Sequence, residues 1–163
     1  MVFQTKKPVR NKIEIIENFL SNNLCEDLID FIENNKSLTF NHTGNLIEIE
    51  ITKMNRFNDL FNTINNYVYN LNCEIDWIHI VKWRDDCNQD LHLDTSENKT
   101  VYSSIMYLND GYLGGQTFFE DGLVVKPIKG KALFFNGIHY KHGVLPVKKG
   151  PRYTLATWYK DIK

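Results

Sequence analysis

The chain has 163 residues, of which 42% are hydrophobic and 13% aromatic, and a formal net charge of −1. This length is enough for one packed core and too short for two ordinary domains, so we expect a single domain over residues 1–163. The small net charge conceals a basic C-terminal third, because residues 126–163 carry nine Lys or Arg against the single acid Asp161. Such a block can attract an anionic ligand or a nucleic acid, but solvated lysines on loops and strand ends explain it more simply.

The first residues, "MVFQTKKPVRNK", contain no apolar stretch of the kind found in signal peptides. No later segment approaches the run of about 18 apolar residues that a membrane-spanning helix needs. The three cysteines, Cys25, Cys73 and Cys87, are far apart and form no C-x-x-C motif, so neither a disulfide framework nor a zinc knuckle is indicated. We therefore expect a cytoplasmic protein that does not bind membranes.

Two helices are predicted in the N-terminal third of the chain. In "NFLSNNLCEDLIDFIENN", Ser21 or Asn22 can cap a helix, and the apolar stripe that follows consists of Leu24, Leu28, Ile29 and Ile32. The second helix, Arg56 to Leu71, follows the i, i+3, i+4, i+7 pattern. Its apolar residues are Phe57, Leu60, Phe61, Ile64, Tyr67, Val68 and Leu71. Both stripes are expected to face the core.

After Asn72 the pattern changes to short apolar runs separated by Gly, Asn, Asp and Pro. The runs are "IDWIHIVKW", "TVYSSIMYLN", "GGQTFFE", "LVVKPI", "KALFFN", "HGVLPV" and "RYTLATWY". This spacing is typical of an antiparallel sandwich or barrel. We therefore predict a mainly β protein with N-terminal helices (α+β), in which residues 1–72 are the helical part and residues 73–163 the sheet core.

One short motif in the predicted sheet core carries possible metal chemistry. In "QDLHLDTSENKT", His92 and Asp94 are one residue apart, so on a strand they face the same side and can bind one cation together. A single H-x-D triplet carries little weight by itself. With a second histidine, however, the set would match the two-histidine, one-carboxylate site of non-haem Fe(II) oxygenases, which leaves coordination positions open.

The other four histidines are the candidates for the third ligand: His42, His79, His139 and His142. His42 lies in a predicted helix-to-strand connection. His79 lies within "DWIHIVKW", where a half-buried histidine that is hydrogen-bonded to its neighbours is the simpler interpretation. His139 and His142 therefore remain open on residue arguments alone.

Four segments together resemble the Fe(II)- and 2-oxoglutarate-dependent oxygenases, specifically the prolyl 4-hydroxylase-like branch. They are "HLD", "YLNDGYLGGQTFFED", "VKPIKGKALFF" and "HGVLPVKKGPRYTLATWY", in the family's order between Ile75 and Tyr159. The segment "IEIIENFLSNNLCEDLIDFIE" is similar to the family's opening strand and helix. The resemblance implies a double-stranded β-helix (a jelly-roll, cupin-like core) and makes His92, Asp94 and His142 the iron ligands.

The resemblance also implies a pocket for 2-oxoglutarate. Arg152 lies ten residues after His142, where related enzymes carry the cation that grips the far carboxylate of this dianion, and a guanidinium can do so with two hydrogen bonds. The other residues assigned to the cosubstrate pocket are Tyr107, Thr117, Trp158, Ser103 and Trp83. On the last predicted strand Thr154, Ala156 and Trp158 share the face of Arg152. Trp83 departs from the family, which commonly has Tyr there, and the loop "RDDCNQDL" that follows leaves the substrate class open.

The expected activity is hydroxylation of a peptidyl or protein side chain, with proline as the leading candidate. The resemblance implies Fe(II), 2-oxoglutarate and dioxygen, with ascorbate as reductant and succinate and CO₂ as co-products. The alternatives are an oxygenase acting on a small molecule or a modified nucleic acid, and a jelly-roll binding module without catalysis. Nucleic-acid repair members usually have a second arginine where this chain has Trp158, and an intact ligand set disfavours a binding module. The sequence carries no signal for the oligomeric state.

Overall fold

The computed structural model describes residues 11–42, 45–94 and 99–163. Residues 1–10, which make up most of the N-terminal segment without a signal-peptide pattern, lie outside the described residues. The elements in chain order are β1 (Glu14–Ile16), α1 (Asn22–Asn34), η1 (Lys36–Leu38), β2 (Phe40–His42), β3 (Leu46–Glu50), η3 (Asn55–Phe57), α2 (Asn58–Tyr69), β4 (Cys73–Trp83), β5 (Gln89–His92), β6 (Tyr102–Tyr107), β7 (Leu113–Gly114), β8 (Thr117–Phe119), β9 (Val124–Val125), β10 (Ala132–Phe135), β11 (His142–Val144), β12 (Val147–Lys148) and β13 (Arg152–Asp161).

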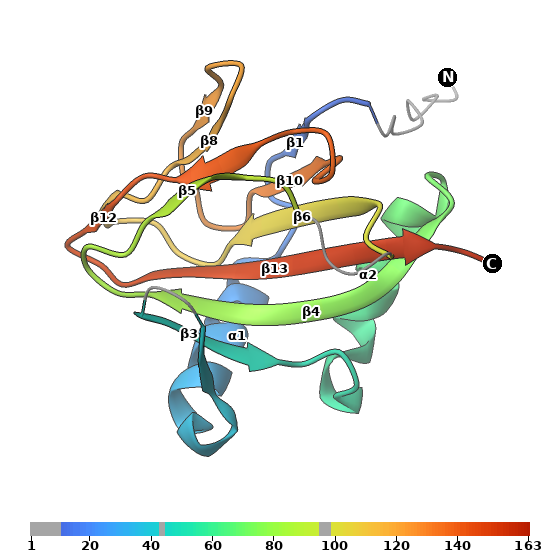
Figure 1. Ribbon diagram of the computed structural model, residues 1–163. Coiled ribbons are helices and arrows are strands. Elements are labelled where there is room, and N and C mark those ends of the chain that lie inside the picture. The colour runs from blue at the N-terminus through green and yellow to red at the C-terminus, as the bar shows by residue number, and fades with distance from the viewer. Residues whose placement is uncertain (1–10, 43–44, 95–98) are drawn as a thin grey trace, which may run out of the picture.

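A seven-stranded antiparallel sheet runs through the whole molecule (Figure 1). Its strand order is β1-β10-β6-β13-β4-β3-β2. The long strand β13 lies between β4 and β6, and this places Arg152 opposite Trp83 and Trp158 opposite Ser103. Alternation along β13 and β4 therefore sends one set of side chains to each face of the sheet.

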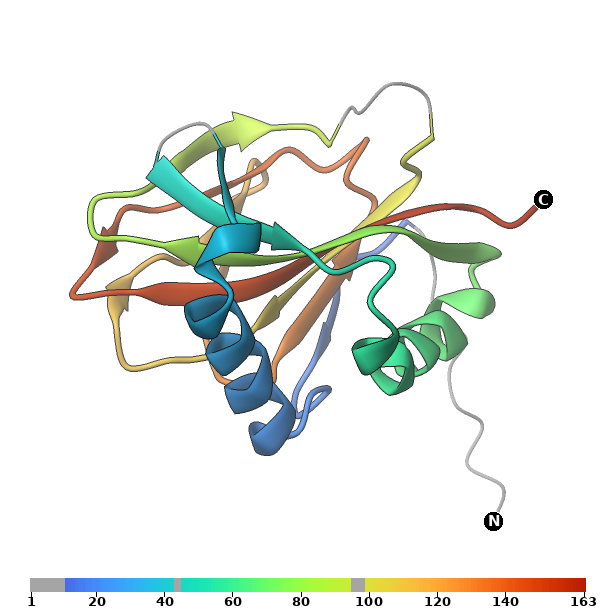
Figure 2. The same cartoon turned by 90° about the horizontal axis from the view of Figure 1, so that it is seen from below.

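The two helices cover one face of this sheet (Figure 2). Helix α1 begins after Ser21, one of the two predicted caps, whose hydroxyl accepts a hydrogen bond from the Leu24 backbone N–H at 3.2 Å. The apolar stripes of both helices pack against Ile78 and Ile80 of β4 in one hydrophobic cluster. Both predicted helices are confirmed. The predicted start of the second at Arg56 falls in η3, which leads directly into α2.

The opposite face of the large sheet lies under two smaller sheets. One has the order β5-β11-β8-β9, and the other pairs β12 with β7. Phe119 of β8 and Leu133 and Phe135 of β10 pack between the layers. Two facing antiparallel sheets with helices on the outside agree with the predicted fold class.

The N-terminal third is not only helical. Strand β1 pairs with β10 at one edge of the large sheet, and the β2–β3 hairpin extends the other edge beside β4. The hairpin was missed because β2 and β3 are short and β2 is exposed over its whole length. No helix in the described part of the chain is long and apolar enough to cross a membrane.

Candidate metal and cosubstrate site

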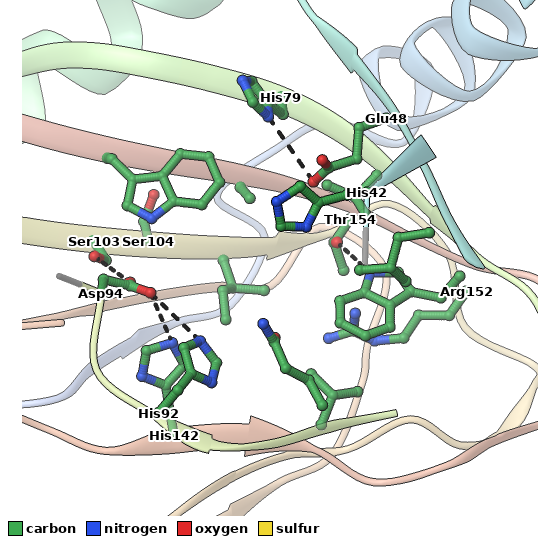
Figure 3. Close-up of a pocket in the computed structure, with 18 of the residues that line it drawn as sticks. His42, Glu48, His79, His92, Asp94, Ser103, Ser104, His142, Arg152 and Thr154 are labelled. Atoms are coloured by element: carbon green, nitrogen blue, oxygen red, sulfur yellow. Dashed lines mark hydrogen bonds and ion pairs between the residues drawn. The ribbon is translucent and has the colours of Figure 1, made fainter. Parts of the chain in front are cut away.

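A cavity of about 420 Å³ opens between the two layers (Figure 3). Strands β3, β4, β6 and β13 of the large sheet line one side of it, and β5 and β11 of the smaller sheet line the other. As predicted from alternation, Arg152, Thr154, Ala156 and Trp158 all face this space. The cavity is thus built from the concave face of the jelly roll.

His92, Asp94 and His142 meet at one side of this cavity, and their ligating atoms all lie within 4.8 Å of one another. His92 ends β5 and His142 begins β11, and the two residues are direct cross-strand partners. Asp94 follows two residues after His92, with its Oδ1 3.5 Å from the Nε2 atom of each histidine. Among the described residues, this is the group of three that can hold a metal ion.

The backbone around the cluster orients both imidazole rings. Nδ1 of His92 lies 2.8 Å from the carbonyl oxygen of Asp90, and Nδ1 of His142 lies 3.0 Å from that of Tyr140. A carbonyl can only accept a hydrogen bond, so each Nδ1 carries a proton, and each Nε2, which faces Asp94, is the nitrogen left for a metal. Second hydrogen bonds of this kind are the usual way in which metal-binding histidines are held.

The carboxylate of Asp94 is held ionised. Burial opposes its ionisation, but hydrogen bonds from His142, His92 and Ser103 outweigh burial and keep the Asp94 pKa well below its ordinary value. The Ser103 hydroxyl donates to Oδ2 at 2.6 Å, which leaves Oδ1 facing the two histidines. Burial lowers the pKa of His92, but its hydrogen bonds with Asp94 and Asp90 outweigh burial and raise it overall. A proton therefore competes with a cation for this ligand set at mildly acidic pH.

Of the four remaining histidines, only His142 belongs to this cluster among the described residues. His139 is exposed and lies in a separate surface hollow. His42 and His79 line the cavity but lie apart from the cluster (Figure 3). The expectation that His79 is hydrogen-bonded to its neighbours is wrong, because neither of its ring nitrogens has a hydrogen-bond partner. The reason is its direction: it projects from β4 into the cavity.

Gly137 was missed by the sequence reasoning although it shapes the cluster. Its carbonyl oxygen accepts a hydrogen bond from the Asp94 backbone N–H at 2.8 Å. A Cβ atom at this position would lie 2.6 Å from Oδ2 of Asp94 and would also overlap the Ser103 hydroxyl. Only a glycine therefore leaves room for the carboxylate where it stands.

We expect Gly137→Ala to weaken Fe(II) binding by about 10-fold or more, the range found when a residue that orients a metal ligand is lost. The added methyl group meets the ends of two side chains rather than backbone, so the strain displaces the carboxylate and leaves the fold intact. Anaerobic Fe(II) titration and thermal unfolding measure the two effects. Ser103→Ala, which removes one hydrogen bond without adding bulk, should have the smaller effect. Unchanged affinity in a folded Gly137→Ala variant would contradict this account.

Arg152 lies buried at another end of the same cavity, with 1% of its surface exposed. Its guanidinium carbon lies 4.6 Å from the ring centre of Trp83 and 5.5 Å from that of Tyr107. Nη2 donates to the Thr117 hydroxyl at 3.4 Å, whereas Nε and Nη1 have no hydrogen-bond partner. The structure gives Arg152 no ion pair within the described residues. A buried cation with two free donors is suited to bind an anion.

The other predicted cosubstrate residues fall into two groups. Trp83, Ser103 and Trp158 line the cavity itself. Tyr107 and Thr117 contact Arg152 instead, and the Tyr107 hydroxyl donates to the Thr117 hydroxyl at 2.6 Å. These contacts hold the guanidinium in place.

Tyr112 is a further residue at Arg152 that sequence reasoning missed. Its ring lies beside the arginine, since a Cβ atom on Gly115 would be 3.0 Å from both side chains. Its hydroxyl is buried without a hydrogen-bond partner. Burial raises the pKa of Tyr112 although Arg152 opposes the shift, so the group stays protonated and can donate. In the sequence, only the position of this tyrosine in "YLNDGYLGGQTFF", close to the two glycines, indicated such a role.

Several solved structures with the same architecture are prolyl hydroxylases. A prolyl-4-hydroxylase from Pseudomonas putida superposes with a TM-score of 0.75 at 20% identity, over 94% of each chain. A viral collagen prolyl hydroxylase from Paramecium bursaria Chlorella virus-1, solved as a 2-oxoglutarate complex, gives 0.73 at 18% identity over 100% of both chains. A prolyl hydroxylase from Trichoplax adhaerens, solved with a hypoxia inducible factor peptide fragment, gives 0.78 at 19% identity over 93% of this chain and 84% of that one. These likenesses confirm the jelly-roll fold.

Sequence comparison points the same way. Human prolyl 3-hydroxylase 3 is 37% identical over 65 residues, which are 36% of this chain and only 9% of that protein. The family model of the 2OG-Fe(II) oxygenase superfamily matches residues 78–160, half of this chain and the part that contains the histidine–aspartate cluster and Arg152. The resemblance read from the motifs is therefore confirmed, and the chain belongs to the 2OG-Fe(II) oxygenase superfamily.

Proposed function

We propose that this protein is a 2-oxoglutarate-dependent dioxygenase that hydroxylates a proline side chain in a peptide or protein substrate. Membership of the superfamily implies Fe(II) and 2-oxoglutarate. The observation that carries the proposal is that the cluster of His92, Asp94 and His142 and the anion-binding Arg152 line one cavity. A metal chelated by one end of 2-oxoglutarate and a cation gripping its other end need this arrangement.

The cluster fits Fe(II). Two neutral imidazoles and one carboxylate bind on one side of the metal and leave the other side for ligands that react. The Asp94 carboxylate is ionised and both Nε2 atoms face it, so the ligand atoms point toward one place without a turn of either ring. With Fe(II) in place, dioxygen and 2-oxoglutarate react to give succinate and CO₂, and one oxygen atom enters a C–H bond of the substrate.

The Arg152 end fits the far carboxylate of 2-oxoglutarate. The unpaired Nε and Nη1 atoms and the Tyr112 hydroxyl together offer donors to a carboxylate that has left water. Trp83 covers one side of the guanidinium and donates its indole N–H to the Thr154 hydroxyl at 3.3 Å, which holds the ring in place. These residues thus bind and orient the cosubstrate and exclude water. Ascorbate is proposed as the reductant that keeps the iron as Fe(II).

Proline is proposed because the fold matches prolyl hydroxylases over almost the full chain. The nucleic-acid alternative draws its support from the basic C-terminal third, and the structure gives many of those lysines acidic partners. The pairs are Lys129–Glu26, Lys131–Glu17, Lys141–Glu120, Lys148–Asp86 and Lys160–Glu74. Paired and dispersed lysines do not make the continuous basic surface that a nucleic acid needs.

Succinate formation tests the proposal directly. The purified protein is incubated with Fe(II), ascorbate and 2-oxoglutarate, with and without a proline-rich peptide. We expect the peptide to increase succinate formation and to gain one oxygen atom by mass spectrometry. The matched control is the same peptide with alanine at each proline, which should do neither.

Two results would contradict the proposal in different ways. Equal succinate with both peptides, and no oxygen added to either, would exclude proline and favour a small molecule or a modified nucleic acid as substrate. No succinate under any condition, from protein that binds Fe(II), would favour a binding module without catalysis.

A further inference from the structure

A second polar pair, Glu48 and His79, lines the same cavity and takes no part in the site described above. Figure 3 shows the two residues well apart from His92 and His142, and apart from Arg152. Glu48 comes from β3 and His79 from β4. The pair therefore belongs to the part of the cavity wall that neither the metal nor 2-oxoglutarate is proposed to occupy.

The pair is largely buried, and the histidine of the pair is unsatisfied. Glu48 is 7% exposed. Its Oε1 lies 3.9 Å from Nδ1 of His79, which is too long for a hydrogen bond. Both ring nitrogens of His79 are buried without a partner. Buried ring nitrogens without a partner are costly, so this histidine beside a largely buried carboxylate marks a place where a ligand supplies what is missing.

Aromatic rings surround the pair. The centre of the His79 ring lies 5.7 Å from that of Phe40 and 5.3 Å from that of Trp158, both in edge-to-face contact. Phe40 and Trp158 also line the cavity. Aromatic rings next to a carboxylate are the usual surroundings of a bound ammonium or guanidinium group.

No lysine or arginine in the described part of the cavity lining is available to Glu48. Among the described residues that line the cavity, the only lysine or arginine is Arg152, which lies at the cosubstrate end. The one other carboxylate in the lining is Asp94, which is held by the two histidines and Ser103. The unmatched charge on the substrate side of the cavity is thus negative.

We infer that Glu48 and His79 bind a cationic side chain of the substrate, a lysine or arginine near the residue that is hydroxylated. The carboxylate accepts hydrogen bonds from the cation, a ring nitrogen of His79 accepts another, and Phe40 and Trp158 cover its alkyl stem. This inference rests on the proposed function for the site and adds a substrate class to it, namely basic peptides.

Peptide binding tests the inference without turnover. Fluorescently labelled proline peptides carry lysine, or its uncharged analogue norleucine, at each position flanking the proline in turn. Fluorescence polarisation measures their affinity for the protein loaded with Fe(II) and 2-oxoglutarate in the absence of dioxygen. At one position lysine should bind about 10-fold or more tightly than norleucine, as expected for a hydrogen-bonded charge.

Glu48→Gln keeps the shape of the side chain and should remove this preference for lysine. Glu50→Gln is the matched control, because Glu50 lies two residues further along the same strand and is exposed, and it should keep the preference. His79→Phe keeps an aromatic ring and should reduce the preference in part. No preference for lysine at any position, or an equal preference in wild type and Glu48→Gln, would overturn the inference.

The same peptides separate this inference from the proposed function. If lysine peptides with alanine in place of proline still bind in a Glu48-dependent way, and no proline is hydroxylated, the cation site stands and proline is wrong. If proline peptides are hydroxylated equally with lysine and with norleucine at every position, prolyl hydroxylation stands and the cation site is wrong.

Discussion

Asp94→Ala is expected to abolish succinate formation and to weaken Fe(II) binding by more than about 100-fold. Loss of a residue that only orients a ligand costs about 10- to 100-fold, and Asp94 is a proposed ligand itself. Its carboxylate also balances the charge of the metal in a site where water is largely excluded, so no nearby group in the cluster can replace it.

The fold should survive this substitution, because the layers are held by the cluster that contains Phe119, Leu133 and Phe135, to which Asp94 does not belong. Anaerobic Fe(II) titration, succinate formation and thermal unfolding are the measurements. His142→Ala should behave like Asp94→Ala, whereas His139→Ala, on the exposed surface, should behave like wild type. Full activity in Asp94→Ala would remove the ligand assignment, and loss of iron in His139→Ala would show that the wrong distal histidine was chosen.

Arg152→Ala is expected to raise the apparent constant for 2-oxoglutarate by about 30-fold or more. The guanidinium is 1% exposed, and its two unpaired nitrogens are the proposed donors to the far carboxylate. Removing it would leave a buried, unpaired anion, a loss of about 2 to 5 kcal/mol, and each 1.4 kcal/mol is about tenfold in affinity.

Two milder variants sharpen this test. Arg152→Lys keeps the charge but not the planar pair of donors, so its constant should rise less. Tyr112→Phe removes only the hydroxyl beside Arg152 and should also have a smaller effect. Fe(II) affinity without cosubstrate should barely change in any of the three, because Arg152 lies away from the ligands (Figure 3) and Tyr112 lies beside Arg152.

The measurement is succinate formation during a 2-oxoglutarate titration. If the apparent constant for 2-oxoglutarate is unchanged in Arg152→Ala, another cation binds its far carboxylate. Lys131 and Lys141 are the alternatives along the chain, but Lys131 donates to the carbonyl of Lys126 and pairs with Glu17, and Lys141 pairs with Glu120. Neither lines the cavity, so an unchanged constant would also contradict the alignment of the last strand.

The local sequence pattern was enough to predict the helices and the strand faces, which depend on residues close together in the chain. The helical periodicity located α1 and α2 to within a few residues, because an apolar stripe has only one way to face a core. Alternation on the last strand placed Arg152, Thr154, Ala156 and Trp158 on one face, because successive side chains of any strand point to opposite sides. The motifs, read through the family they resemble, also selected His142 over His139.

The tertiary structure decided what depends on segments that are distant in sequence. His142 joins His92 only because β11 pairs with β5, and Gly137 matters only because Asp94 and Ser103 converge on it. Tyr112 lies beside Arg152 only because the fold brings the segment around Gly115 against that arginine.

Glu48 shows the physical reason most plainly. In "LIEIE" the alternation assigns the isoleucines to the core and Glu48 and Glu50 to the other face, which an antiparallel sheet commonly turns to water. Glu50 is exposed as that pattern suggests, but Glu48 is buried, because the other face of β3 looks into the cavity beside His79. Periodicity determines which side of a strand a residue takes, whereas the cost of burying its charge is determined by whatever the fold brings to that side.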